Sequence, residues 1–242
     1  MDKIYKYNRI LIKLSGEGLV NKEKKLAIDY DMVEDIARQL KIISEKGIQI
    51  SIVIGGGNFW RGASAEKNGI PRNRADYIGM LATIMNGLAL KSGFEKVGLK
   101  ARVQSSLIVD QKVAENYINE KTIKYLKEGE IVIFVGGTGR PYFTTDTAAT
   151  LFASEIKADV ILMGKNGVSG IYDSDPKFNP NATKFDKISY DEVLDKKLQV
   201  MDLTATSMAR DNKINLIIFN INEENSIIRA VEGKIDHTEV TN

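Results

Sequence analysis

The sequence contains no cysteine and a single histidine, His237, and these two scarcities exclude several kinds of active site. Without cysteine the chain can form no disulfide, offers no thiolate nucleophile and cannot bind zinc through sulfur. A lone histidine near the C-terminus does not support a Ser-His-Asp relay or a histidine-rich metal site. Any enzymatic chemistry should therefore rest on lysine, arginine, aspartate, backbone amides and a hard metal ion. Phosphoryl transfer is the main reaction class that needs little else, because it depends on positioning and on stabilising charge.

Long apolar runs and a strong charge imbalance are also missing. No run approaches the roughly 20 residues that span a bilayer, and residues 1–7 lack the apolar core of a signal peptide. We therefore expect a cytoplasmic protein without a membrane partner. The 34 basic and 32 acidic residues leave a net charge of +2, which argues against a strongly basic surface, so no nucleic-acid partner is predicted.

Short apolar runs alternate with segments of helical periodicity along the chain. The predicted strands are residues 9–14, 48–54, 97–105, 131–135, 159–163 and 214–219, with 238–240 as an edge strand. The predicted helices are residues 29–47, 72–93, 121–128, 144–157, 189–197, 202–212 and 223–232, and residues 176–186 are predicted to be a long surface loop. This alternation predicts an α/β fold with a mainly parallel sheet and right-handed connections. Residues 1–242 are predicted to be one domain, with a boundary between two lobes near residue 158.

Two further expectations concern the helix predicted for residues 72–93. Asp76 is placed in its first turn, where a carboxylate stabilises the helix dipole. The buried stripe of this helix is expected to consist of Ile78, Leu81, Ala82, Met85, Leu88 and Ala89. The small residues between them would allow another helix to pack closely, within the domain or between subunits.

The stretch of residues 131–149 combines a strand, a glycine turn and a helix start. Five apolar residues lead into Gly136, Gly137 and Gly139, and Asp146 opens an alanine-rich helical pattern. Glycines let backbone N–H groups approach an anion, and a helix N-terminus adds partial positive charge. Taken alone, the stretch fits a phosphate loop and an ordinary tight turn with an aspartate cap equally well.

Three other predicted strands end in similar turns, at residues 16–18, 55–57 and 164–170. In a parallel sheet these turns share one edge, where ligands bind. Lys13 precedes the first turn and Arg61 follows the second, and each fits an ordinary surface charge as well as a phosphate ligand. The chain has no Gly-x4-Gly-Lys-Ser/Thr, Gly-x-Gly-x-x-Gly, His-Arg-Asp or Asp-Phe-Gly motif. The residues alone therefore indicate a phosphate or nucleotide site without a standard P-loop.

Five motifs together resemble those of bacterial uridylate kinases, the UMP kinases of the amino-acid kinase fold. They are Ile12-Lys-Leu-Ser-Gly-Glu17, Val53-Ile-Gly-Gly-Gly-Asn58 with Arg61-Gly62, Asp76 before Met80-Leu-Ala-Thr-Ile-Met-Asn86, Gly137-Thr-Gly-Arg-Pro-Tyr-Phe-Thr-Thr-Asp146, and Met201-Asp-Leu203. The resemblance runs from about residue 9 to the C-terminus. The second, third and fourth motifs are specific to this branch, whereas the first motif and the paired glycines indicate only the wider fold.

The resemblance implies a three-layer αβα sandwich around a mainly parallel sheet. Within it, residues 1–158 would form a lobe for UMP binding and oligomerisation, and residues 159–242 a lobe for ATP binding. The implied activity is that of a kinase with a phosphate group as acceptor, which converts UMP and ATP to UDP and ADP with Mg²⁺ in pyrimidine nucleotide biosynthesis. A homohexamer, allosterically regulated by UTP and GTP, is implied as well. No metal-ligating residue is assigned.

The resemblance also implies roles for individual residues. The catalytic set is Lys13, Asp146, Lys165 and Arg61, in which Lys13 contacts the transferring phosphoryl group and Asp146 orients the lysines. The predicted ATP-binding residues are Lys13, Leu14, Ser15, Gly16, Gly57, Arg61, Asn166, Tyr172 and Asp175. The predicted UMP-binding residues are Gly56, Asp76, Gly137, Thr138, Gly139, Arg140, Pro141, Tyr142, Phe143 and Thr144, with Asp76 on the ribose.

Two positions depart from the family pattern. Arg140 stands where the family commonly has asparagine, and Ser169 stands where it commonly has aspartate. Other enzymes of the fold, which act on aspartate, glutamate, acetylglutamate or carbamate, form the alternative prediction. A non-catalytic nucleotide-binding protein is a further alternative, against which the presence of Lys13, Arg61 and Asp146 argues.

Overall fold

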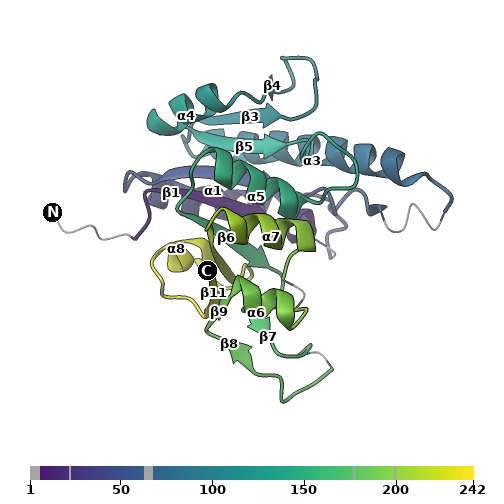
Figure 1. Ribbon diagram of the computed structural model, residues 1–242. Helices are drawn as coiled ribbons and strands as arrows, with labels where there is room; N and C mark the ends of the chain where they lie inside the picture. Colours follow the sequence, from purple (N-terminus) through teal and green to yellow (C-terminus); the bar gives the residue numbers. More distant parts are fainter. Residues whose placement is uncertain (1–5, 22, 63–67, 177, 199) are drawn as a thin grey trace.

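The computed structural model describes residues 6–21, 23–62, 68–176, 178–198 and 200–242, and one large sheet runs through it (Figure 1). The strands of this sheet, in spatial order, are β4 (Glu115–Asn116), β3 (Ala101–Ser105), β5 (Ile131–Val135), β2 (Gln49–Ile54), β1 (Arg9–Leu14), β6 (Val160–Lys165), β10 (Asn215–Asn220), β11 (His237–Thr241) and β9 (Lys187–Ser189). All neighbours pair in parallel except β10 and β11. The prediction of a mainly parallel sheet is therefore confirmed.

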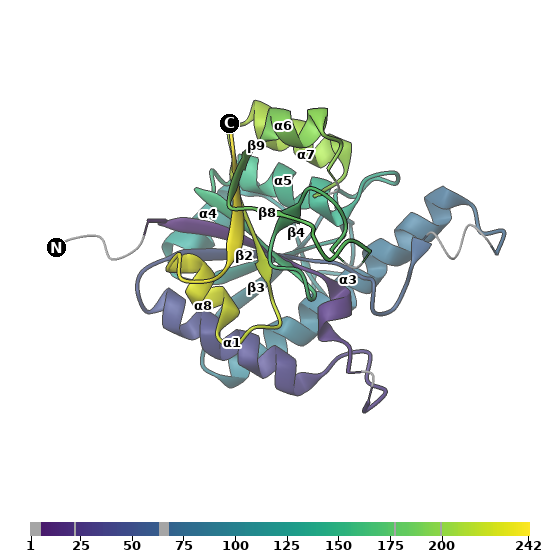
Figure 2. The ribbon, with the colours of Figure 1, turned by 90° about the horizontal axis from the view of Figure 1, so that it is seen from below.

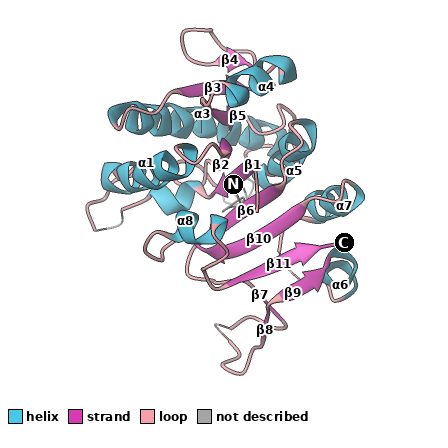
Figure 3. Cartoon of the chain, turned by 90° about the vertical axis from the view of Figure 1, so that its left-hand side faces the viewer, coloured by secondary structure: helices cyan, strands magenta, loops and turns pink. Residues whose placement is uncertain are grey.

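Helices cover both faces of the sheet, as Figures 2 and 3 show. One face packs against α1 (Tyr30–Ser44), α3 (Arg72–Lys96) and α8 (Ser226–Val231). The other face packs against α4 (Asn119–Lys127), α5 (Thr145–Glu155), α6 (Tyr190–Asp195) and α7 (Leu203–Asp211). A short 3-10 helix, η1 (Gly16–Leu19), follows β1. The expected three-layer αβα sandwich is confirmed. No helix in these described ranges is long and apolar enough to span a membrane.

The central strands are mostly apolar because both of their faces are buried, and the polar residues of β1 are Arg9 and Lys13. In β1, Ile10 and Ile12 face the core beneath α1 and α3, while Leu11 between them faces the core beneath α5. Each is fully buried. Burial of apolar surface is the dominant stabilising contribution to such a core. A parallel sheet covered on both faces needs such continuous apolar runs, which is why the sequence predicted these strands well.

The buried face of α3 differs from the one predicted. Leu81, Met85 and Leu88 were expected in the core, but their exposed fractions are 50%, 48% and 36%. The helix approaches the sheet closely at Gly87, where an added Cβ would lie 2.4 Å from Val135 Cγ1, and its buried large apolar residues are Met80, Ile84, Leu90 and Phe94. The close approach excludes a larger side chain at Gly87, and Ala82 is buried as predicted at 4% exposure. Asp76 lies in the second turn of α3, and its predicted place in the first turn was wrong.

Three boundaries differ from the prediction for identifiable reasons. The strand predicted to begin at residue 97 begins at Ala101, because α3 continues to Lys96 and ends through Gly98, whose φ is +83°. The predicted loop 176–186 contains a strand, β8 (Lys184–Phe185), which pairs antiparallel with β7 (Ile171–Tyr172) in a small second sheet. The predicted edge strand is the internal strand β11, and the true edge is β9, which is too short to give a periodic signal.

Candidate active site

Four glycine-bearing turns meet at one edge of the sheet, as predicted. They follow β5, β2, β1 and β6, which are consecutive neighbours in the sheet and parallel to one another. The turns after β1 and β2 touch: a Cβ on Gly16 would lie 2.5 Å from the carbonyl oxygen of Gly55. Only glycine allows this approach, which leaves the backbone of both turns close to the same space.

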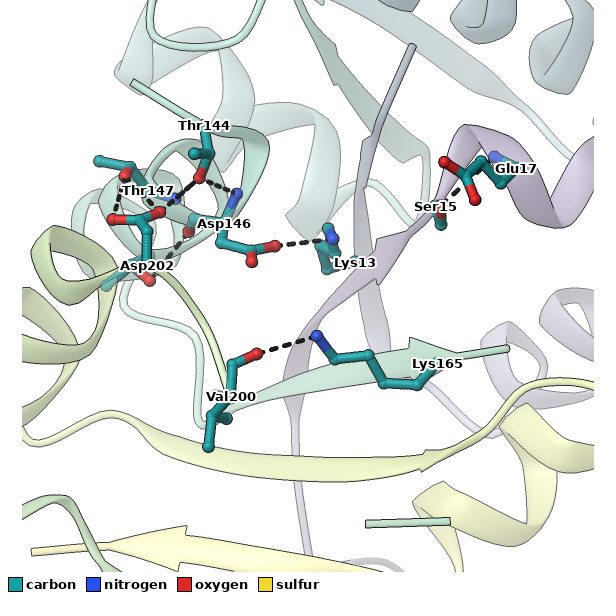
Figure 4. A network of polar contacts seen from close by, with 10 residues as sticks. Lys13, Ser15, Glu17, Thr144, Asp146, Thr147, Lys165, Val200 and Asp202 are labelled. Atoms are coloured by element: carbon teal, nitrogen blue, oxygen red, sulfur yellow. Dashed lines mark hydrogen bonds and ion pairs between the residues drawn. The ribbon is translucent and has the colours of Figure 1, made fainter. Parts of the chain in front are cut away.

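Lys13 and Asp146 form a partly buried ion pair at this edge (Figure 4). Lys13 Nζ lies 2.6 Å from Asp146 Oδ1, and the two side chains are 12% and 17% exposed. Lys13 stands near the end of β1, and Asp146 stands in the first turn of α5. Asp146 does not cap its helix, because Thr144 Oγ1 accepts the N–H groups of Asp146 and Thr147 at 3.1 and 3.3 Å. The carboxylate is thereby left for the lysine.

Lys165 brings a second cation to the same place. It ends β6, the strand beside β1, and its Nζ donates to the carbonyl oxygen of Val200 at 2.8 Å. Burial lowers the pKa of Lys165 below its usual value, while the nearby Asp146 carboxylate raises that pKa and Lys13 lowers it. The three charges therefore interact, and together they carry a net positive charge that suits an anionic ligand.

Asp202 contacts the start of α5, the helix that carries Asp146. It accepts hydrogen bonds from the hydroxyl of Thr144 and from that of Thr147, the latter at 3.0 and 3.1 Å to its two oxygens. It also caps α7 by accepting the N–H of Ala205 at 2.9 Å. Asp202 therefore joins the starts of α5 and α7. The sequence motif at 201–203 included it, but gave it no role. Its place before a helical pattern could have identified it as an N-cap.

Two cavities lie next to the charged residues. The larger, of about 540 Å³, is lined by Lys165, Val168, Gly170, Ile171, Tyr172, Asp173, Ser174, Asp175, Pro176, Lys196, Lys197, Leu198, Val200 and Ile218. The smaller, of about 130 Å³, is lined by Gly56, Gly57, Trp60, Gly62, Ala75, Asp76, Gly79, Met80, Thr83, Gly137, Phe143, Thr144 and Thr145. Lys165 lines the first and Thr145, beside Asp146, lines the second. Lys13 and Asp146 are not part of either lining, and they adjoin the two cavities through Lys165 and Thr145.

Only some of the predicted ATP-binding residues lie around the same cavity. Lys165, Tyr172 and Asp175 line the larger cavity, whereas Gly57 lines the smaller one. Asn166 is exposed and faces Gly18.

The remaining members of that predicted group lie in or near the turn after β1. Leu14 is 3% exposed, and its backbone oxygen accepts the N–H of Gly55 at 3.0 Å. Ser15 caps η1 through a 3.3 Å bond from the N–H of Glu17. Arg61 is 65% exposed, and its guanidinium pairs with Glu17 Oε1 at 2.8 Å. The structure therefore places Arg61 on the surface, outside the lining of both cavities.

The predicted UMP-binding residues divide into two groups. Gly56, Asp76, Gly137, Phe143 and Thr144 line the smaller cavity. The others form the rest of the loop outside that lining: Thr138, Gly139, Arg140, Pro141 and Tyr142. Tyr142 is connected to the cavity through its backbone, because its N–H donates to Asp76 Oδ2 at 2.7 Å.

A pair of asparagines that the sequence analysis gave no role holds the glycine turn after β2. Asn86, fully buried in α3, donates to the carbonyl oxygen of Gly55 at 2.7 Å. Its side-chain amide also exchanges two 2.8 Å hydrogen bonds with that of Asn58. An amide in the middle of an otherwise apolar helix face was the available signal, since a buried amide needs such partners.

Comparison with known proteins agrees with this geometry. Residues 8–220 match the model of the Amino acid kinase family. The uridylate kinases of Mycoplasmopsis synoviae and Mycoplasmopsis pulmonis are 79% and 73% identical, over 98% of this chain in each case and over 99% and 98% of the relatives. The crystal structure of UMP kinase from Ureaplasma parvum is 42% identical, with a TM-score of 0.93 over 97% of this chain and 99% of that one. The corresponding structure from Bacillus anthracis is 40% identical, with a TM-score of 0.92 over 97% and 96%. The chain therefore belongs to the amino acid kinase family and, within it, to the uridylate kinases.

Proposed function

We propose that this chain transfers the γ-phosphoryl group of ATP to the phosphate of UMP, giving ADP and UDP. The observation that carries the proposal is the Lys13–Asp146 ion pair, with Lys165 beside it, between a nucleotide-sized cavity and a smaller one. Relatives at up to 79% identity are named uridylate kinase, which supports UMP as the acceptor. The larger cavity would hold ATP and the smaller one the acceptor.

The chemistry of this transfer asks little of the protein beyond positioning and charge. Charge spreads over the transferring phosphoryl group in the transition state. Lys13 and Lys165 would stabilise that charge, and Asp146 would hold the Lys13 ammonium in place. UMP is already an anionic phosphate at neutral pH, so the acceptor needs no general base. This accords with a chain whose single histidine, His237, lies on β11 and outside the lining of both cavities.

Magnesium would arrive with ATP. The described residues contain no group of three or more histidine, aspartate or glutamate side chains that could hold a cation. This fits Mg²⁺, which such sites bind through substrate phosphates, waters and one or two carboxylates. Asp146, whose Oδ1 is buried, is the carboxylate that this chain offers beside the lysines. When bound, the ion would neutralise charge on the phosphates of ATP.

The remaining expectations from the sequence stay proposals, and some have support. The predicted homohexamer requires contacts between copies, and such contacts are supported by the exposed apolar face of α3, formed by Tyr77, Leu81, Met85 and Leu88. A single domain with lobes 1–158 and 159–242 is supported by the sheet that runs through both. Regulation by UTP and GTP, a cytoplasmic location and a place in pyrimidine biosynthesis are retained as predictions from the resemblance.

A panel of acceptors tests the proposal. Purified protein with ATP and Mg²⁺ would be incubated separately with UMP, CMP, aspartate, glutamate, acetylglutamate and carbamate, and ADP release and product identity would be measured. We expect UDP from UMP and at most slow turnover with the others. No UDP formation would contradict the kinase proposal and favour a nucleotide-binding protein. Efficient turnover of an amino acid or carbamate would contradict UMP as the acceptor.

A further inference from the structure

Tyr142 has an unusual backbone conformation in the loop that would bind the acceptor. Its φ is +73°, in the left-handed region that residues other than glycine adopt at a cost. Its side chain is 67% exposed, so burial of the ring does not compensate for that cost. Three glycines in the same loop, Gly136, Gly137 and Gly139, also have positive φ but pay no such penalty. Some contact must therefore hold Tyr142 in place.

The contact that holds Tyr142 comes from Asp76. The backbone N–H of Tyr142 donates to Asp76 Oδ2 at 2.7 Å, a short hydrogen bond to a charged acceptor. Asp76 lies on α3, its side chain is 14% exposed, and it lines the smaller cavity. One carboxylate thus contacts both the acceptor cavity and the strained residue of the acceptor loop.

Arg72 completes the cluster from one turn earlier on α3. Its Nε donates to both oxygens of Asp76, at 3.0 Å each. Its guanidinium carbon lies 5.8 Å from the centroid of the Tyr142 ring, within the range of a cation–π interaction. Arg72 therefore contacts both the carboxylate and the ring, and the three residues form a closed set of contacts.

We propose that Arg72 is a positioning residue of the acceptor site. It fixes the carboxylate of Asp76, which then holds Tyr142 in the left-handed conformation and gives the loop 137–144 its binding shape. A carboxylate offers about four acceptor positions. The bonds from Arg72 and Tyr142 therefore leave Asp76 able to accept a further hydrogen bond from a sugar hydroxyl of the acceptor. This inference rests on the proposed function, because it assigns the smaller cavity to UMP.

An ordinary surface ion pair is the competing explanation. Arg72 and Asp76 are spaced i, i+4, and such pairs stabilise a helix by only about 0.2–0.5 kcal/mol. If that were the whole role of Arg72, its loss would leave substrate binding unchanged. The positioning role predicts a loss that is specific to the acceptor, since Arg72 lies outside the lining of the larger cavity.

The test compares Arg72→Gln with Arg74→Gln, which removes an exposed arginine two residues along the same helix. We expect Arg72→Gln to raise the KM for UMP about tenfold or more, with kcat and the KM for ATP within about twofold of the original protein. Arg74→Gln should change none of these. Trp60, the single tryptophan, lines the smaller cavity, so its fluorescence should report UMP binding without turnover. The Kd measured in this way should rise by the same factor as KM.

A second pair of variants tests whether Arg72 acts through the loop. Tyr142→Gly removes the ring and the backbone cost together, so adding Arg72→Gln to it should weaken UMP binding less than in the original protein. Arg72→Lys keeps the charge and should restore binding partly. Thermal unfolding of each variant checks that it folds.

Three results would overturn the inference. They are an unchanged UMP Kd and KM in folded Arg72→Gln, an equal loss in Arg74→Gln, and a fall in kcat with binding intact. If the original protein is active with UMP and any of these occurs, the inference alone fails. If the original protein neither binds nor phosphorylates UMP, the proposed function fails and the inference fails with it.

Discussion

Asp146 occupies a position where a carboxylate would stabilise a helix whatever the protein did. It lies in the first turn of α5, near the positive end of the helix dipole. In the structure Thr144 provides the cap, and the Asp146 carboxylate contacts Lys13. The two explanations of Asp146, structural and catalytic, can therefore be separated by substitution.

We predict that Asp146→Asn abolishes most turnover while the protein still folds. Asparagine keeps the size of the side chain but loses the charge that holds Lys13. The free energy of unfolding should fall by about 1–3 kcal/mol, because the pair is only partly exposed, whereas kcat should fall at least about a hundredfold. Steady-state kinetics and urea unfolding measure the two effects. Asp191→Asn, which changes an exposed carboxylate with a side chain that is 75% exposed, serves as the control. Normal turnover in Asp146→Asn would remove Asp146 from the catalytic set.

Lys165 gives the proposed enzyme a predicted alkaline limit. Burial lowers its pKa in the folded protein below the value of 10.5 that it has when unfolded. The folded protein therefore releases this proton at a lower pH than the unfolded chain does. The resulting destabilisation is fully present below the folded pKa and disappears as pH rises toward 10.5. Stability and catalysis should consequently respond to this titration in opposite directions.

We predict that kcat/KM for ATP declines at a pH below 10.5 as Lys165 loses its charge. A pH profile of initial rates measures this decline, with unfolding monitored at each pH. Arg is charged at every accessible pH, so Lys165→Arg should move the decline to higher pH even if its rate at neutral pH is reduced. An identical alkaline decline in Lys165→Arg would show that another group titrates.

At the scale of the elements, six of the described helices end in one of two ways. The position after the C-cap is glycine in α3, α4 and α8, at residues 98, 129 and 233. It is lysine in α5, α6 and α7, at residues 157, 197 and 213, with φ of 53–54°. Glycine adopts this left-handed conformation without strain, and lysine does not. The lysine-terminated helices therefore carry strain that a substitution can relieve.

We predict that Lys157→Gly stabilises the protein by about 0.5 kcal/mol, since relief of the strain outweighs the greater freedom of glycine in the unfolded chain. The matched substitution, Gly129→Ala, should destabilise it by about 1 kcal/mol, because a Cβ there meets no atom within 4 Å and only the backbone is affected. Urea unfolding of both variants measures the difference. A loss of stability in Lys157→Gly would show that the lysine side chain contributes more than its backbone costs.

The sequence predicted an element well where a continuous run of its residues is buried. It predicted poorly where the buried face is decided by how closely a neighbouring element packs. Strands β1, β2, β5 and β6 are mostly apolar, so their own residues identify them. The buried face of α3 depends instead on how closely the sheet approaches, and that is decided by Val135 against Gly87. Leu81, Met85 and Leu88 were assigned to the core face because helical periodicity alone gives no information about the distance between the helix and the sheet.

The candidate site shows the same division. The residues alone left 131–149 undecided between a phosphate loop and a capped turn, and only the family resemblance gave its residues individual roles. The Lys13–Asp146 pair joins residues far apart in the chain, as do the contacts of Asp202 with Thr144 and Thr147. Such pairs depend on tertiary structure, which spacing in one sequence does not contain. The glycine turns could be recognised from the sequence because the conformational role of a glycine depends on its own position in the chain.

At the scale of the molecule, the two lysines of the proposed catalytic set lie where the two predicted lobes join. Strands β1 and β6 pair in register, with Lys13 opposite Met163, and Lys165 follows two residues later. Each lobe therefore supplies one lysine, and each cavity is lined by residues of one lobe. A phosphoryl group passing between two nucleotides would travel only across the shared strand pair, which favours a rigid central sheet with substrate-specific loops around it.

The exposed face of α3 leads to the last prediction, which concerns assembly. Tyr77, Leu81, Met85 and Leu88 lie on successive turns, and their side chains are 36–50% exposed. A contiguous apolar face on a long helix suits a symmetric contact with the same face of a second copy. Because α3 also carries Arg72 and Asp76, such a contact would lie on the helix that positions the acceptor loop.

We predict that the original protein sediments as an oligomer and that Leu81→Glu with Met85→Glu lowers its mass, because charges at both positions would be buried unpaired in the contact. Analytical ultracentrifugation measures the mass. Ile42→Glu, at a residue of α1 that is 45% exposed, is the matched control and should leave it unchanged. A monomeric original protein would contradict assembly altogether. An unchanged mass in the double variant would place the contact on another surface, and an equal loss in Ile42→Glu would assign the effect to added charge rather than to the face of α3.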